Sequence, residues 1–204
     1  MEPKAKPSNT GSKKLFHNPI LEILTRTHIS ITIVIFILLP VALLYYGLSQ
    51  GYINNINAIG LFFGGMVSFT FVEYLMHRFL FHISPTTPGR EKFARIVHGA
   101  HHEFPKDKDR ISMPPLPMIL LILFFFGIFW LMLGNYVFGF VPGFYVGYLL
   151  YTSIHYAIHA YQPPKNFLKI LWVHHGIHHY KDPENAFGVS SPFWDFLFGT
   201  LPKK

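Results

Sequence analysis

The stretch "YVFGFVPGFYVGYLLYTSIHYAIH", residues 136–159, decides the fold. It is apolar or aromatic along most of its length, and it ends in His155 and His159, which are four residues apart. A bilayer core about 30 Å thick requires a helix of about 20 apolar residues. The stretch therefore predicts a transmembrane helix that carries two imidazoles to one surface of the membrane.

Three further stretches meet the same requirement, at residues 29–48, 56–77 and 117–134. The connections "SQGYINN" (49–55) and "GNY" (134–136) are short, so each pair of stretches predicts a helical hairpin. The composition agrees, because 50% of the residues are hydrophobic and only 13% are charged, against about 25% charged in soluble domains. We expect one all-α integral membrane domain with four transmembrane helices.

The positive charges lie on one side of these predicted helices. The 17 lysines and arginines fall before the first helix, between the second and third, and after the fourth: Lys4, Lys6, Lys13, Lys14, Arg26; Arg78, Arg90, Lys92, Arg95, Lys106, Lys108, Arg110; Lys165, Lys169, Lys181, Lys203 and Lys204. Cytoplasmic flanks carry such an excess, so both termini and the long loop are predicted to be cytosolic. The net charge of +7 then reflects topology and anionic headgroups, and no nucleic-acid partner is expected.

This topology divides the chain into two parts. We expect a polar N-terminal tail and interfacial segment at residues 1–28 and a membrane domain at residues 29–204. Within the membrane domain, residues 78–116 and 160–204 are predicted to form a cytosolic cap. A bacterial inner membrane and an endoplasmic reticulum membrane both fit this arrangement.

Ten of the 13 histidines form four groups with regular spacing. They are His77 and His82 in "HRFLFH"; His98, His101 and His102 in "HGAHH"; His155 and His159 in "HYAIH"; and His175, His178 and His179 in "HHGIHH". His77 lies 22 residues after Asn55, and His155 lies 20 residues after Asn135. At a rise of about 1.5 Å per residue, both lie about 30 Å above the far-side turns. The triads lie in segments predicted to be cytosolic, so all four groups can converge at one membrane surface.

The spacing within the groups favours a metal centre. Residues three and four apart share a helix face, so each triad is expected to point its three imidazoles one way, as is the pair 155/159. The pair 77/82 is five apart, which predicts that the helix loosens or ends between its members. Neutral imidazole is the commonest metal ligand, and the chain has no cysteine for a thiolate site. Ten ligands are too many for one metal, so two metals with four or five imidazoles each are predicted.

Other titratable residues near these groups have two interpretations each. Glu73, one turn before His77, either orients an imidazole ligand or packs within its helix. Asp195 either accepts a hydrogen bond from a ligand histidine or caps a helix. The histidines outside the four groups are expected to be interfacial anchors or solvated residues; these are His17, His28 and His174.

Two classes of protein without enzymatic activity provide alternatives. A metal transporter should place polar ligands near the bilayer midplane and show repeat symmetry, whereas these histidines gather at one surface. A bis-histidine haem protein would use facing pairs and would leave both triads unexplained.

The histidine-bearing segments resemble the fatty acid hydroxylase superfamily, which includes sterol desaturases, and they are most similar to its fatty acid 2-hydroxylase branch. They are "EYLMHRFLFH", "HGAHHEFPKDKDRISMPP", "HYAIH" and "HHGIHHYKDPENAFGVSSPFWDFLFGT", in this order over residues 73–200. The resemblance implies four transmembrane helices under a cytosolic cap that holds a dinuclear metal centre. It also implies that all ten grouped histidines are ligands, with no further catalytic residue.

The resemblance further implies an O2-dependent monooxygenase that hydroxylates C-2 of the acyl chain of a sphingolipid, a ceramide or a free fatty acid. No dinucleotide-binding motif such as GxGxxG is present, and the cytochrome b5 domain usual in eukaryotic members is not seen. Cytochrome b5 or a ferredoxin, with a reductase, is therefore the expected external electron donor. Iron is the expected metal, although zinc could replace it in a purified sample. A sterol desaturase, a methyl oxidase or a carotenoid hydroxylase with the same centre is the alternative.

Overall fold

The computed structural model describes residues 7–202, and every regular element in that range is a helix. The prediction of an all-α protein is therefore confirmed. Four residues of the charge argument, Lys4, Lys6, Lys203 and Lys204, lie outside the described residues.

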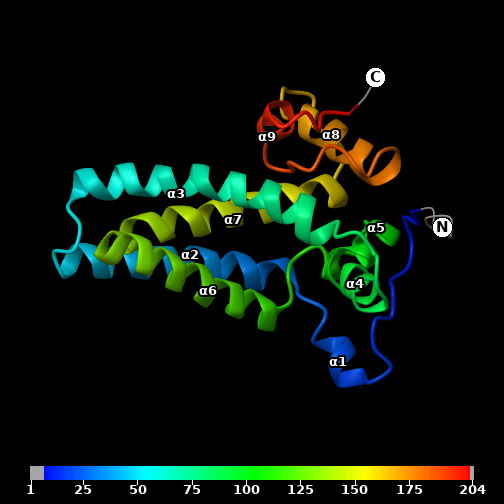
Figure 1. Cartoon of the computed structure of the whole chain (residues 1–204), viewed down its shortest axis with the longest axis horizontal. Coiled ribbons are helices and arrows are strands. Elements are labelled where there is room, and N and C mark those ends of the chain that lie inside the picture. Colours follow the sequence, from blue (N-terminus) through cyan, green and yellow to red (C-terminus); the bar gives the residue numbers. More distant parts are fainter. Residues whose placement is uncertain (1–6, 203–204) are drawn as a thin grey trace.

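Four long helices form the body of the described chain (Figure 1). They are α2 (Ile29–Ser49), α3 (Asn55–Leu75), α6 (Pro115–Leu133) and α7 (Val137–Ala160). Each coincides with a predicted stretch to within two residues at either end. A π-helical turn, η1 (Met76–Phe81), continues α3, and a 3-10 turn, η4 (Gly134–Tyr136), joins α6 to α7.

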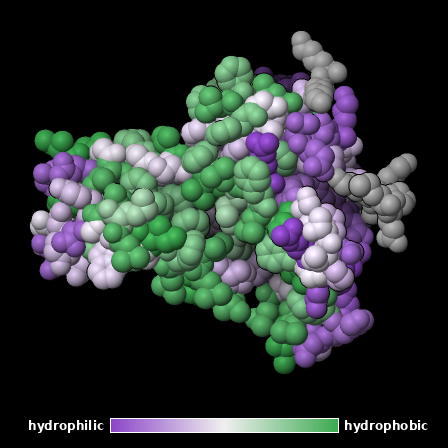
Figure 2. Space-filling view, in the orientation of Figure 1, coloured by the Kyte–Doolittle hydropathy of each residue, from purple (hydrophilic) through white to green (hydrophobic). Residues whose placement is uncertain are grey.

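Three helical stretches in residues 7–202 are long and apolar enough to cross a membrane: Ile29–Ser49, Asn55–Phe81 and Lys108–Ala160. The third contains both α6 and α7, which run in opposite directions (Figure 1). Hydrophobic residues cover the middle of the bundle, and hydrophilic residues gather at its two ends (Figure 2). An apolar belt between polar ends is the surface that a bilayer requires, so the chain is a membrane protein.

The centre of the bundle is α7, which packs against both α2 and α3. Glycines allow the backbones of α3 and α7 to approach closely. A Cβ atom on Gly65 would overlap the carbonyl oxygen of Phe140, and one on Gly143 would overlap the carbonyl oxygen of Phe62. Small residues at such crossings are the usual means of close helix packing in membranes. This contact fixes α3 and α7 side by side, so their histidine-bearing ends finish together.

Shorter helices cap the end of the bundle where α3 and α7 finish (Figure 1). In the described part of the chain they are α1 (Pro19–Ile23), α4 (Pro88–Ala94), η2 (Arg95–Gly99), α5 (Ala100–Glu103), η3 (Lys108–Arg110), α8 (Lys169–Tyr180) and α9 (Phe193–Leu197). Of these, α4, η2 and α5 follow one another without a break. Helices this short are marginal on their own, so the cap depends on packing among its members.

Candidate metal centre

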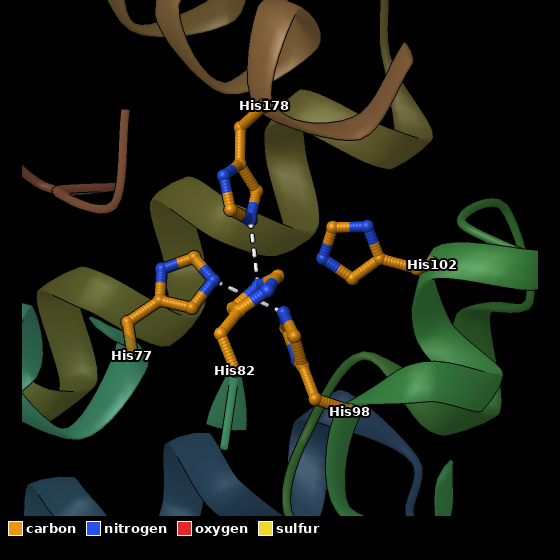
Figure 3. Close-up of side chains that lie close together, drawn as sticks. All are labelled: His77, His82, His98, His102 and His178. Atoms are coloured by element: carbon orange, nitrogen blue, oxygen red, sulfur yellow. Dashed lines mark hydrogen bonds between the residues drawn. The ribbon is translucent and has the colours of Figure 1, made fainter. Parts of the chain in front are cut away.

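The structure brings all ten histidines of the four groups together in two clusters of five. Cluster A comprises His77, His82, His98, His102 and His178, and cluster B comprises His101, His155, His159, His175 and His179. Within each cluster, one ring nitrogen from every histidine lies within 4.8 Å of the others. The rings of cluster A converge on a common point from three parts of the chain (Figure 3).

Each triad serves both clusters, which corrects the expectation that its three imidazoles point one way. In the first triad His98 and His102 belong to cluster A, whereas His101 belongs to cluster B. The triad of α8 divides in the reverse sense, because only its middle member, His178, belongs to cluster A. On a helix with 3.6 residues per turn, position i+4 lies about 40° from i, and position i+3 lies about 60° to the other side. The outer members of a triad therefore face one cluster, and the middle member faces the other.

A π-helical turn explains the spacing of five between His77 and His82. In η1 the N–H of His82 donates to the carbonyl oxygen of His77 at 3.2 Å, so the two residues are one π turn apart and share a face. The predicted loosening of the helix at this point is confirmed. A second π-helical turn, η2, carries His98. Such turns within α-helices are frequent at functional sites.

The ring nitrogens are spaced as the ligands of one metal ion would be. In cluster A, Nε2 of His77 lies 3.0 Å from Nε2 of His98, and Nε2 of His178 lies 3.0 Å from Nε2 of His82 (Figure 3). Three Nε2 pairs in cluster B lie 3.0 Å, 3.0 Å and 3.1 Å apart. Two nitrogens bound at about 2.1 Å to one metal ion, at a right angle, lie about 3.0 Å apart. The donors and their spacing therefore fit a metal ion in each cluster.

Burial keeps imidazoles of both clusters in the neutral form that binds metals. It lowers the pKa of His98, His101 and His175 well below the ordinary value, and neighbouring imidazoles lower the pKa further. Burial also lowers the pKa of His178, to about 4. At neutral pH a metal ion would therefore meet free lone pairs and would displace no proton from these rings.

Two histidines of cluster A are oriented by backbone carbonyl groups. Nδ1 of His77 donates to the carbonyl oxygen of Phe187 at 2.5 Å, and Nδ1 of His178 donates to that of Asn185 at 2.7 Å. A carbonyl oxygen only accepts, so each proton lies on Nδ1 and leaves the Nε2 lone pair for a metal. Sequence reasoning missed both carbonyl groups, because the residue letters carry no signal for a backbone acceptor.

Glu73 and Asp195 accept hydrogen bonds from backbone N–H groups beside the clusters. Glu73 accepts hydrogen bonds from the N–H groups of Val189 and Ser190, at 2.7 Å and 2.9 Å. Asp195 is fully buried and accepts from Nε2 of His174 at 2.9 Å. The histidine that Asp195 contacts is therefore not a member of either cluster, in contrast to the ligand contact considered from the sequence.

His174 differs from its predicted environment. It belongs to neither cluster, but it is only 6% exposed, so the prediction of an interfacial anchor or a solvated residue is wrong for it. His17 and His28 are exposed, as predicted. Burial alone would raise the pKa of the Asp195 carboxyl, but hydrogen bonds from His174, Thr200 and two backbone N–H groups outweigh it and lower that pKa below its ordinary value. Asp195 is thus a carboxylate at neutral pH.

A cavity of about 590 Å³ adjoins both clusters. Its wall includes His98 of cluster A together with His101 and His155 of cluster B. The lining also includes Arg110 in the cap and Phe144 in the bundle. Most of the lining side chains are apolar. The cavity could therefore hold an extended apolar molecule whose polar end lies near the cap.

The chain combines a membrane-spanning helical bundle, two clusters of five histidines and an apolar cavity beside them. These features place it in the class of membrane proteins with a histidine-rich metal site. The sequence model of the family described as "Fatty acid hydroxylase" matches residues 62–200, a range that contains both clusters. The chain belongs to the fatty acid hydroxylase family.

Individual relatives agree with this assignment. The chain is 37% identical over 147 residues to the fatty acid 2-hydroxylase of Mus musculus, a match that covers 70% of this chain and 40% of that one. It is 37% identical over 195 residues to the ceramide very long chain fatty acid hydroxylase SCS7 of Saccharomyces cerevisiae, covering 93% of this chain and 50% of that one. The chain thus spans half or less of the length of these two relatives.

A solved structure has the same fold. The structure described as "Full length scs7p (only hydroxylase domain visible)" superposes with a TM-score of 0.87 at 33% sequence identity. The match covers 95% of this chain and 74% of that one.

Proposed function

We propose that the chain is an O2-dependent monooxygenase that hydroxylates C-2 of a fatty acyl chain, in a ceramide or other sphingolipid or in a free fatty acid. The observation that carries this proposal is the apolar cavity, whose wall contains histidines of both clusters. The names of the relatives, fatty acid 2-hydroxylase and ceramide very long chain fatty acid hydroxylase, support the same reaction and substrate class.

The lining of the cavity supports attack near the polar end of the acyl chain. The tail would lie along the lining inside the bundle, where Phe69, Phe125 and Phe144 contribute. The carboxyl or amide end would lie toward Arg110 and Ser112 in the cap-side wall. Ser112 Oγ lies 3.5 Å from Oγ1 of Thr152, one turn before His155 on α7. A carbon close to a polar end held there would therefore lie near the histidines.

The reaction balances with one external donor. The substrate C–H bond and O2, with two electrons and two protons, give the C–OH product and water. We expect cytochrome b5 or a ferredoxin, with its reductase, to supply the two electrons.

All ten histidines of clusters A and B would hold two metal ions through one ring nitrogen each. Iron is the expected metal, because it supplies the reversible electron chemistry that O2 activation needs, whereas zinc has none. The chain itself keeps the rings neutral by burial, orients two of them through carbonyl groups, and keeps water from the reacting carbon by its apolar cavity.

For the topology we propose four crossings, by α2, α3, α6 and α7, with both termini and the cap in the cytosol. The absence of lysine and arginine from both hairpin connections supports this orientation. A bacterial inner membrane or an endoplasmic reticulum membrane would serve as the host.

The test combines metal content with lipid mass spectrometry of cells that express the wild type or His178→Ala. We expect about two metal ions per wild-type chain and an acyl product heavier by one oxygen atom, which His178→Ala abolishes. His17→Ala removes an exposed histidine outside both clusters and should leave metal content and product unchanged. One metal ion or none in the wild type would contradict the proposal. Two metal ions without a hydroxylated acyl lipid would indicate that the substrate is a sterol or a carotenoid and not an acyl lipid.

A further inference from the structure

The loop of residues 185–190, "NAFGVS", lies against cluster A. It provides both carbonyl groups that orient ligand histidines, from Asn185 to His178 and from Phe187 to His77. The loop is therefore the part of the backbone on which the ring orientation of two cluster A members depends.

Two buried acidic side chains hold this loop by four consecutive N–H groups. Asp195 accepts from the N–H of Phe187 at 2.9 Å and from that of Gly188 at 2.7 Å. Glu73 accepts from the next two N–H groups, those of Val189 and Ser190, and from the Ser190 hydroxyl. Hydrogen bonds to an ionised acceptor such as Asp195 are among the strongest in proteins. Glu73 adds three further hydrogen bonds, so the two side chains fix the loop on α3 and α9.

The loop backbone is strained and closely packed. Ala186, between the two residues that supply the carbonyl groups, is fully buried and has a φ of 60°, a left-handed conformation that is unfavourable for a residue with a Cβ atom. A Cβ atom on Gly188 would overlap the carbonyl oxygen of Ser191 and lie 2.9 Å from Oδ2 of Asp195. A strained backbone conformation persists only where the surrounding contacts are strong enough to hold it.

A further layer holds the Asp195 carboxylate in place. His174 donates to Oδ2 of Asp195 at 2.9 Å, and the Thr200 hydroxyl donates to Oδ1 at 2.7 Å. Thr200 also lies 3.0 Å from the hydroxyl of Tyr74 on α3. The burial of His174, which the sequence did not explain, is thus accounted for by its contact with Asp195.

Four of the five histidines of cluster B lack an equivalent support. Within residues 7–202, Nδ1 of His101, His155, His175 and His179 has no hydrogen-bond partner. The two clusters therefore have the same number of imidazoles but different surroundings.

We propose that Glu73 and Asp195 are positioning residues that act through the 185–190 loop on His77 and His178, and so set the metal affinity of cluster A and not that of cluster B. This inference rests on one part of the proposed function, namely that each cluster binds one metal ion. Loss of an outer-shell partner typically lowers metal affinity 10- to 100-fold. We expect this loss of metal affinity at cluster A and not at cluster B.

The experiment uses the purified full chain, stripped of metal and titrated with Zn²⁺ alone. The variants are Asp195→Asn and Glu73→Gln, which keep side-chain size and replace one accepting oxygen with an amide. Gly188→Ala is a third variant that displaces the loop without changing any carboxylate. The matched control is Glu22→Gln, because Glu22 also accepts two backbone N–H groups, from Leu15 and Phe16, away from both clusters.

We expect two Zn²⁺ ions per chain in the wild type and in Glu22→Gln, and one site weakened about 10- to 100-fold in the loop variants. Anomalous scattering should place the remaining ion in cluster B. Equal weakening of both sites, or two sites of wild-type affinity in folded variants, overturns the inference while the proposed function stands. A wild type that binds fewer than two ions overturns both. If Asp195→Asn does not fold, Gly188→Ala decides in the same way.

Discussion

Asp195 and His77 are joined through one residue, Phe187. Its N–H donates to Oδ1 of Asp195 at 2.9 Å, and its carbonyl oxygen accepts from Nδ1 of His77 at 2.5 Å. A carboxylate in helix α9 is therefore linked by two hydrogen bonds to an imidazole in η1, the turn that continues α3. The connection runs through the backbone of the 185–190 loop.

Two neighbouring histidines should hold different metal ions. His101 belongs to cluster B and His102 to cluster A. We expect His101→Ala and His102→Ala each to retain about one metal ion, in cluster A and cluster B respectively. Metal analysis with anomalous scattering would check this, and loss of the same ion in both variants would contradict the division of the triad.

The close contact of α3 and α7 should be sensitive to a single methyl group. Gly143→Ala places a Cβ atom on the carbonyl oxygen of Phe62. Overpacking of this kind costs about 1–3 kcal/mol, so the thermal unfolding midpoint in detergent should fall. Gly127→Ala on α6 is the matched control, because no other group lies within 4 Å of its added Cβ atom, and it should leave the midpoint unchanged or raise it.

Filling the deep part of the cavity should change the preferred acyl chain length. Ile122 of α6 lines the cavity inside the bundle, away from the histidines. We expect Ile122→Trp to shift the hydroxylated products toward shorter acyl chains, measured by lipid mass spectrometry. Leu123→Trp changes the next residue, which is 63% exposed and outside the cavity, and should keep the wild-type distribution. The same shift in both variants would rule out this cavity as the acyl site.

Metal replacement should separate stability from activity. A ligand that binds only the folded state raises the free energy of unfolding. Both Zn²⁺ and Fe²⁺ should therefore raise the unfolding midpoint of the stripped protein, but only iron should restore hydroxylation in the presence of O2 and an electron donor. Hydroxylation by the zinc form would contradict a redox role for the centre.

Acid should destabilise the metal-free protein between about pH 6.5 and pH 4. The folded-state pKa of His178 is about 4, below the value of about 6.5 for an unfolded histidine. As the pH falls through this range, the unfolded chain takes up a proton that the folded chain does not, so the free energy of unfolding falls. Denaturation in detergent at several pH values would measure the slope, and His178→Gln should reduce it. A free energy of unfolding that stays constant over the range would contradict neutral burial of this ring.

The long helices and the histidine groups could be predicted because their signals are local. Apolar length gives the bounds of α2, α3, α6 and α7 to within two residues. The spacing of His77 and His82 predicts that the helix loosens or ends there, and the structure shows a π turn. The division of the triads could not be predicted from spacing alone, because it depends on where the second cluster lies relative to the helix. His174 was misjudged for a similar reason: its partner, Asp195, lies 21 residues further along the chain and reaches it only in the folded cap.

The division of the triads also bears on how a chain without cysteine holds its cap together. Through η2–α5 and α8, the segments 98–102 and 175–179 each contribute ligands to both clusters. Two bound metals would thus tie together four separate segments of the chain. Each tie closes a loop, which removes entropy from the unfolded chain much as disulfides do. The same atoms would then serve as reaction centre and as cross-links, so that metal loading stabilises the cap as well as enabling the reaction.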